Sequence, residues 1–168
     1  YEKDMLKLLD VDFLIKQFRI DANTTKETYE IFAPYINSHS YFIARYLPEK
    51  KYIDASILLM SEVMKYTPND AYMETFAFLL ARDGKFNEAL DFYPKFLEKY
   101  DDNDVKIDFD MVKDMALESA IRENNIELLQ KLYDLKVDFN HFSNKDKMPP
   151  IFLAMYNKQS EKSAKFLL

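Results

Sequence analysis

The stretch Gly84-Lys85-Phe86-Asn87-Glu88-Ala89 contains the single glycine of the 168-residue chain, with one helical pattern ending before it and another beginning after it. Thirty-four residues earlier the chain reads Lys50-Lys51-Tyr52-Ile53-Asp54-Ala55, so the aromatic residues and the alanines align at one spacing. A fixed period of this length is typical of stacked helical repeats. The sequence therefore predicts an all-α fold, a helical-repeat solenoid of antiparallel helix pairs.

The composition supports this fold class. One glycine and six prolines leave few positions for tight turns with positive φ, which argues against a sheet-rich fold. No run of about 18 apolar residues is present, so we expect no membrane span. No signal peptide is visible, and the absence of cysteine slightly favours a reducing compartment. We therefore expect a cytoplasmic protein, although a chain that opens at Tyr1 leaves targeting open.

The charge of the chain bears on its partners. The net charge is −6 and the isoelectric point is near 5.0. A nucleic-acid-binding protein normally presents a basic face to phosphates, so we expect no nucleic-acid partner. Mild acidity is compatible with a basic protein partner, although it is usually a solubility feature. We therefore expect the partner to be another protein or a peptide segment.

The N-terminal part is expected to form a helical lid over residues 1–35. Thr24 and Glu27 have the spacing of a capping box, in which each side chain satisfies a free backbone N–H at a helix start. The helix that follows is expected to be disturbed at or before Pro34. Ser38 is then expected to cap a further helix, which ends at Pro48.

The middle of the chain shows three amphipathic patterns. The first runs over residues 52–66, and Thr67-Pro68-Asn69-Asp70 ends it and caps the second, which ends at Gly84. The third begins at Phe86 and contains Pro94, which is expected to kink the helix. The alternative is that Pro94 occupies the first turn of a new helix that begins near Tyr93, where proline is tolerated.

Residues 36–103 resemble two tetratricopeptide repeats. The positions that match the motif are Ile43, Tyr46, Tyr52, Ala55 and Leu59 in the first repeat, and Met73, Phe76, Ala77, Leu80, Gly84, Phe86, Ala89, Tyr93 and Phe96 in the second. The resemblance implies helix pairs that approach closely at the small Ala89 and turn at Gly84. Some tetratricopeptide domains hold a C-terminal carboxylate on their inner helices. The corresponding positions here look like Ser40, Ala44 and Thr75, so that clamp is not carried over.

Residues 104–168 are expected to form ankyrin-like repeats, the last one incomplete. After the acidic linker Asp101–Asp104, a helix is expected to resume near Asp110. From residue 114 the order helix, Asn124-Asn125 turn, helix and loop resembles an ankyrin repeat, and the loop carries the polar pair Asp138 and Asn140.

The ankyrin resemblance implies glycine at three positions, which here are occupied by Asn124, Lys136 and, about ten residues later, Asp146. Asparagine tolerates positive φ better than most residues, and lysine does not share this property. Short helices are expected over residues 150–156 and from about Glu161. The apolar end Phe166-Leu167-Leu168 predicts that the chain continues or that another molecule covers this end.

The sequence lacks the motifs of common catalytic and metal sites. One glycine excludes a phosphate loop and a dinucleotide fingerprint. His39 and His141 are too far apart for a helical zinc-protease motif, and Asp101–Asp104 lacks the glycine and closing Glu of a calcium loop. We therefore expect no enzyme, no cofactor and no metal site.

The function predicted from this architecture is a non-catalytic protein–protein interaction module, a scaffold that binds through the concave surface of its solenoid. The alternatives are an inhibitor or immunity-type protein that neutralises a basic partner, and an accessory repeat segment of a larger chain. Phe78 is expected to be the large apolar group that faces the partner; the alternative is that it packs under the lid or against the next helix. The predicted partner-binding residues are Asn37, Ser40, Ala44, Glu74, Phe78 and Arg82.

Overall fold

The structure is a computed structural model of the chain, and it describes residues 26–47, 49–99, 103–142, 148–157 and 160–168, without the side chains of residues 28, 93–99 and 103–108. Within these ranges every regular element is a helix and none is a strand, which confirms the all-α prediction for this part of the chain. The chain forms two compact units, Tyr1–Asp83 and Gly84–Leu168. The predicted lid residues 1–25 and the Thr24 cap lie outside the described residues.

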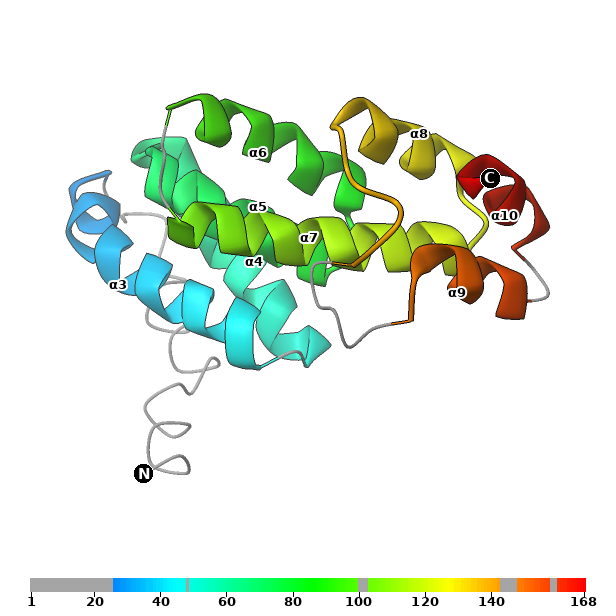
Figure 1. Cartoon of the computed structure of the whole chain (residues 1–168). Coiled ribbons are helices and arrows are strands. Elements are labelled where there is room, and N and C mark those ends of the chain that lie inside the picture. Colours follow the sequence, from blue (N-terminus) through cyan, green and yellow to red (C-terminus); the bar gives the residue numbers. More distant parts are fainter. Residues whose placement is uncertain (1–25, 48, 100–102, 143–147, 158–159) are drawn as a thin grey trace. The chain divides into compact units, whose positions relative to one another are not determined.

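The first unit contains α3 (Lys26–Tyr46), α4 (Lys50–Tyr66) and α5 (Asp70–Arg82), shown in Figure 1. Each of the three helices contacts the other two. The cap predicted between α4 and α5 is confirmed at Asn69, whose Oδ1 accepts a hydrogen bond from the N–H of Tyr72 at 3.0 Å. The core of this unit includes Ile53, Met60, Val63, Phe78 and Leu79.

The break expected near Pro34 is wrong, because α3 continues through this residue without interruption. Proline has no N–H and its ring crowds the carbonyl of Glu30, so it disfavours a helix locally. The neighbouring Ala33 and Ile36 are buried, and their packing favours continuation of the helix. Ser38 is not a cap: its Oγ donates to the carbonyl of Pro34 at 2.9 Å inside the helix. The expected boundary at residue 35 therefore falls within α3.

The second unit contains α6 (Phe86–Lys99), α7 (Asn103–Arg122), α8 (Ile126–Asp134), α9 (Pro150–Tyr156) and α10 (Glu161–Leu167). Helix α7 contacts each of the other four, and α8 also contacts α6 and α10. The bounds of α9 and the start of α10 agree with the prediction.

One helix boundary of this unit differs from the prediction, and the alternative helix start near Tyr93 is not observed. Helix α7 begins at Asn103 rather than near Asp110, so part of the expected acidic linker is helical. Asparagine and aspartate are favoured at helix starts, where negative charge complements the helix dipole. Position 94 lies inside the uninterrupted α6, and no new helix begins near Tyr93.

Two turns of the second unit place non-glycine residues in the left-handed region. Asn124 has φ 56° and Lys136 has φ 59°, and these are two of the positions at which the ankyrin resemblance implies glycine. The third, Asp146, lies outside the described residues. After α7, the N–H of Asn125 donates to the carbonyl of Ala120 at 2.8 Å. After α8, the N–H of Val137 donates to the carbonyl of Leu132 at 3.1 Å. Both helices therefore end in a Schellman motif, which satisfies carbonyls that have no partner within the helix.

Helices α9 and α10 both contact α7 and lie at its C-terminal end (Figure 1). Ser160 Oγ donates to the carbonyl of Ile121, and Asn157 Nδ2 donates to the carbonyl of Arg122 at 3.0 Å. The N–H of Ser163 donates to Asn124 Oδ1 at 2.8 Å. Polar groups at the end of α7 are thus satisfied by the following helix pair rather than by water.

Candidate functional site

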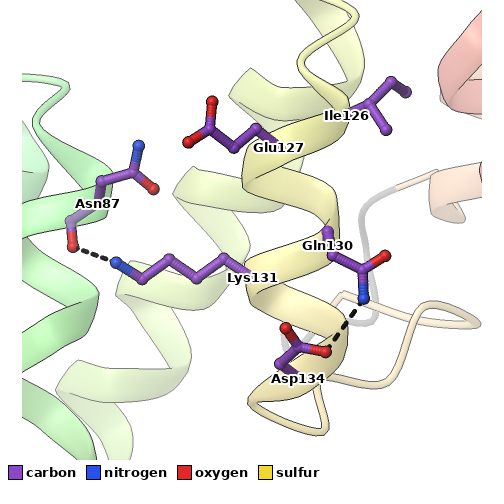
Figure 2. Close-up of a pocket in the computed structure, with 6 residues that line it drawn as sticks. All are labelled: Asn87, Ile126, Glu127, Gln130, Lys131 and Asp134. Carbon is purple, nitrogen blue, oxygen red and sulfur yellow. Dashed lines mark hydrogen bonds between the residues drawn. The ribbon is translucent and has the colours of Figure 1, made fainter.

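A pocket of about 630 Å³ lies between α6 and α8 in the second unit (Figure 2). Its α8 wall follows from the amphipathic pattern of that helix. Leu128, Leu129 and Leu132 turn into the core, so the opposite face carries polar residues at helical spacing. The lining residues are Asn87, Ile126, Glu127, Gln130, Lys131 and Asp134.

Lys131 connects the two walls of this pocket. Figure 2 shows its side chain reaching from α8 toward Asn87 on α6, where Nζ donates to the main-chain carbonyl at 2.6 Å. Nζ also forms an ion pair with Asp91 Oδ1 at 2.7 Å. Because Lys131 is the only cation among the lining residues and is already paired, Glu127 and Asp134 leave the pocket negative. The arrangement suits a basic side chain, with Ile126 as an apolar contact.

The sequence analysis did not identify this pocket. The only local signal is the polar face of α8, with residues at i, i+3, i+4 and i+7, and any surface helix shows the same pattern. The pocket results from the approach of α6 to α8, which the sequence pattern does not specify.

A smaller pocket of about 300 Å³ lies where α7 meets the loop after α8. Four of its lining residues interact in pairs: Lys113 forms an ion pair with Asp110 at 2.5 Å, and His141 Nδ1 lies 3.3 Å from Asp138 Oδ2. The N–H of Asn140 donates to Asp138 Oδ1 at 2.9 Å, and this bond lowers the pKa of the Asp138 carboxyl. These interactions are those of a stabilised loop.

The exposure predicted for Phe78 is wrong, because its side chain is completely buried. The prediction assumed that α5 buries a single stripe, whereas α5 contacts both α3 and α4 and buries residues on several sides. Ser40 and Ala44 are buried as well and leave no room for a ligand. Asn37, Glu74 and Arg82 are partly accessible and remain candidates for partner contact.

The structure does bring three of the predicted residues together. Arg82 Nε donates to the carbonyl of Ala44 at 2.6 Å, and the Arg82 guanidinium lies 5.3 Å from the centroid of the Phe78 ring. The Tyr41 ring lies 6.3 Å from that of Phe78 on the α3 side. Burial lowers the pKa of the Arg82 guanidinium, because a charged group is less stable out of water.

Helix α9 exposes large apolar side chains. Phe152, Met155 and Tyr156 are 50%, 67% and 77% exposed, and Met148 just before the helix is 49% exposed. The helix contains no charged residue. Exposed apolar groups that gather on one element are typical of interaction surfaces, whereas single ones need no explanation.

Within the described ranges, no group of three or more His, Cys, Asp or Glu residues is placed to hold a metal ion. In the same part of the chain, no helix has both the length and the apolar content needed to cross a membrane. Comparisons with protein-family models, curated proteins and solved structures find no match to this chain.

Proposed function

We propose that this chain is a non-catalytic protein–protein interaction module. The observation that carries the proposal is the uncharged helix α9, which exposes Phe152, Met155 and Tyr156 to solvent. Aromatic residues and methionine are enriched in protein interfaces, and methionine adapts its shape to irregular partners. A partner that covers this helix removes apolar surface from water, which favours association.

The proposed architecture is a solenoid of stacked helix pairs, tetratricopeptide-like over residues 36–103 and ankyrin-like over residues 104–168. The mutual contacts of α3, α4 and α5 support stacking within the first unit, because in such a stack a helix contacts its own partner and the next pair. The positive φ of Asn124 and Lys136 supports the second part. Stacked pairs present an extended surface on which a partner segment binds.

A basic partner is the second candidate, and the pocket between α6 and α8 favours it. Glu127 and Asp134 line the pocket, while its single cation is paired with Asp91. A lysine or arginine side chain of a partner would complement this negative surface. This candidate corresponds to an inhibitor or immunity-type protein that neutralises a basic protein.

Photo-crosslinking in the source cell tests the first proposal. A benzoylphenylalanine at Met155 should give a discrete protein adduct, because α9 is expected to lie in an interface. The matched control is the same probe at Tyr133, a 57% exposed residue of α8. No adduct at Met155, or equal adducts at both positions, would contradict binding through α9.

The same probe at Gln130 tests the second candidate. An adduct at Gln130 that disappears when Glu127 and Asp134 are both changed to Lys would support recognition of a basic group. An adduct unaffected by these changes would show that the charge of the pocket does not select the partner. The control change is Glu161→Lys, because this exposed residue lies on α10, outside the pocket.

A further inference from the structure

We propose that Arg82 anchors a carboxylate-binding site on the first unit, and that the ligand is a single carboxylate of a partner protein segment. The inference rests on the proposed binding role, and it specifies the chemistry that the first unit recognises. Its basis is the geometry of one guanidinium group that is held firmly on one side and, among the described residues, has no partner on the other.

Two contacts hold the guanidinium of Arg82. The buried Phe78 ring lies beneath it, with 5.3 Å between the guanidinium carbon and the ring centroid. Nε donates to the carbonyl of Ala44 at 2.6 Å, which fixes the rotation of the group. Stacking on an aromatic face and one directed hydrogen bond restrict a side chain that is otherwise flexible. A ligand that binds this group therefore loses little free energy to ordering it.

The terminal nitrogens of Arg82 are unused. A guanidinium has five N–H donors, and the hydrogen bond to Ala44 uses the one on Nε. Within the part of the chain that the structure describes, Nη1 and Nη2 form no hydrogen bond and no ion pair. The adjacent Asp83 does not serve Arg82, because it pairs with Lys50 at 2.7 Å.

Lys131 and Arg122 differ from Arg82 because each has a counter-ion. Lys131, which is also partly buried, is paired with Asp91, and the exposed Arg122 is paired with Glu118 at 2.9 Å. A partly buried charge without a counter-ion is unfavourable, because it has lost hydration without gaining a partner. Arg82 is such a charge, and an external carboxylate would supply the missing partner.

The geometry favours a carboxylate over a more highly charged anion. The two terminal nitrogens of arginine match the two oxygens of a carboxylate in a bidentate pair. The nearby Arg45 is engaged, since its Nη1 donates to the Tyr41 hydroxyl at 2.7 Å. A chain with a net charge of −6 also disfavours a strongly acidic ligand. The site differs from the tetratricopeptide carboxylate clamp, whose expected positions Ser40, Ala44 and Thr75 are buried.

A second unsatisfied group lies on the same stripe of α3. Asn37 is seven residues before Ala44, which places both on one side of the helix, about two turns apart. Its Oδ1 is buried and accepts no hydrogen bond from the residues that the structure describes. A ligand does not reach this covered atom without a movement of the fold, so the proposed site rests on Arg82.

NMR of the arginine side chains tests the proposal with defined probes. The four arginines, Arg19, Arg45, Arg82 and Arg122, give few Nε–H signals to assign. The probes are acetyl-Ala-Glu-Ala-amide, with a side-chain carboxylate; acetyl-Ala-Ala-Ala, with a terminal one; and acetyl-Ala-Gln-Ala-amide, with none. Each is titrated into the full chain at constant ionic strength.

The expected result is a saturable shift of the Arg82 Nε–H signal with a carboxylate peptide and none with the glutamine peptide. The peptide that binds more tightly identifies the source of the carboxylate, a side chain or a chain terminus. The signal of Arg122 should not saturate. Absence of a saturable Arg82 shift with both carboxylate peptides would overturn the proposal.

Substitutions at Arg82 distinguish bidentate hydrogen bonding by the guanidinium group from attraction by a positive charge alone. Arg82→Gln should abolish the saturable binding, and Arg82→Lys should weaken it by about tenfold, because an ammonium does not form the bidentate pair. The control Arg122→Gln should bind as the unchanged chain does. If Arg82→Gln does not fold, the test rests on Arg82→Lys alone. An unchanged affinity of Arg82→Lys for the carboxylate peptides would overturn the bidentate site. If the carboxylate peptides do not bind but the probe at Met155 still gives its adduct, only the Arg82 site is contradicted and the proposed function is still supported.

Discussion

Asn124 Oδ1 accepts two hydrogen bonds from Ser163, one from the backbone N–H at 2.8 Å and one from Oγ at 3.1 Å. Asn124 and Lys136 share a left-handed backbone conformation at the ends of α7 and α8. Only Asn124 uses its side chain to hold the next helix pair, whereas the Lys136 side chain is exposed beside the Tyr133 ring. The same substitution at the two positions should therefore have opposite effects.

Lys136→Gly is expected to stabilise the chain. A left-handed conformation costs a residue with a Cβ roughly 1–2 kcal/mol, and the greater freedom of glycine in the unfolded chain offsets about 0.5–1 kcal/mol of the gain. The expected increase in the free energy of unfolding is therefore about 0.5–1 kcal/mol by these figures. Urea denaturation measures it, and a decrease would show that the Lys136 side chain contributes more than its backbone strain costs.

Asn124→Gly is expected to destabilise the chain, although glycine also suits this backbone. The change removes the acceptor of two hydrogen bonds and leaves the backbone N–H of the buried Ser163 unpaired, which costs about 1–3 kcal/mol. The same urea experiment provides the measurement. If Asn124→Gly and Lys136→Gly both raise the midpoint, the bonds to Ser163 do not stabilise the fold.

Phe78→Ala is expected to lower the free energy of unfolding by about 3–5 kcal/mol, as for other large core residues. The reason is that the Phe78 ring is fully buried and supports both Tyr41 and Arg82. The control is Phe152→Ala on α9, where a half-exposed ring should change stability by about 0.5 kcal/mol or less. Equal effects of the two changes in chemical denaturation would contradict the burial of Phe78.

Pro34→Ala is expected to stabilise the chain by up to ~3 kcal/mol, because the change restores a backbone N–H to the interior of α3 and relieves crowding at Glu30. The matched control is Pro68→Ala in the exposed connection between α4 and α5, where no helical bond is restored. Thermal melting of both variants measures the difference. An unchanged melting temperature for Pro34→Ala would mean that α3 is interrupted in solution.

Ala55→Leu and Ala89→Leu should each destabilise the chain by ~1–3 kcal/mol, because both alanines are buried and a larger side chain overpacks the helix contact. Ala71→Leu is the control, since Ala71 is exposed on α5. If denaturation shows all three changes to be neutral, the alanines aligned at the repeat period do not mark close helix contacts.

The sequence predicted those features that depend on a few neighbouring residues. Asn69 caps α5 because its side chain reaches a backbone N–H three residues later. Asn124 and Lys136, two of the positions with a missing glycine, are left-handed because a helix that ends in a Schellman motif needs that conformation at one residue. Such features are fixed by local geometry, which the sequence displays directly.

Features that depend on tertiary packing could not be predicted in this way. Hydrophobic periodicity predicts a single buried stripe, which suits a helix with one neighbour. Helix α5 has two neighbouring helices and therefore buries Phe78, which lies outside the expected stripe. Pro34 disfavours the helix locally, but the free energy gained by burying the neighbouring residues of α3 is larger. The pocket at Lys131 depends on the distance between α6 and α8, for which the local sequence pattern contains no signal.

The bonds from Ser160 and Ser163 to the end of α7 also bear on the order in which the second unit opens. These hydrogen bonds connect residues that are 39 and 43 positions apart in the sequence. Helices α9 and α10 have only seven residues each. Helices shorter than about 12–15 residues are marginal in water, so this pair owes its order to docking on α7. Amide hydrogen exchange should therefore be fastest in α9 and α10, with the protection of the Ser163 amide reporting a local opening that leaves α7 and α8 folded.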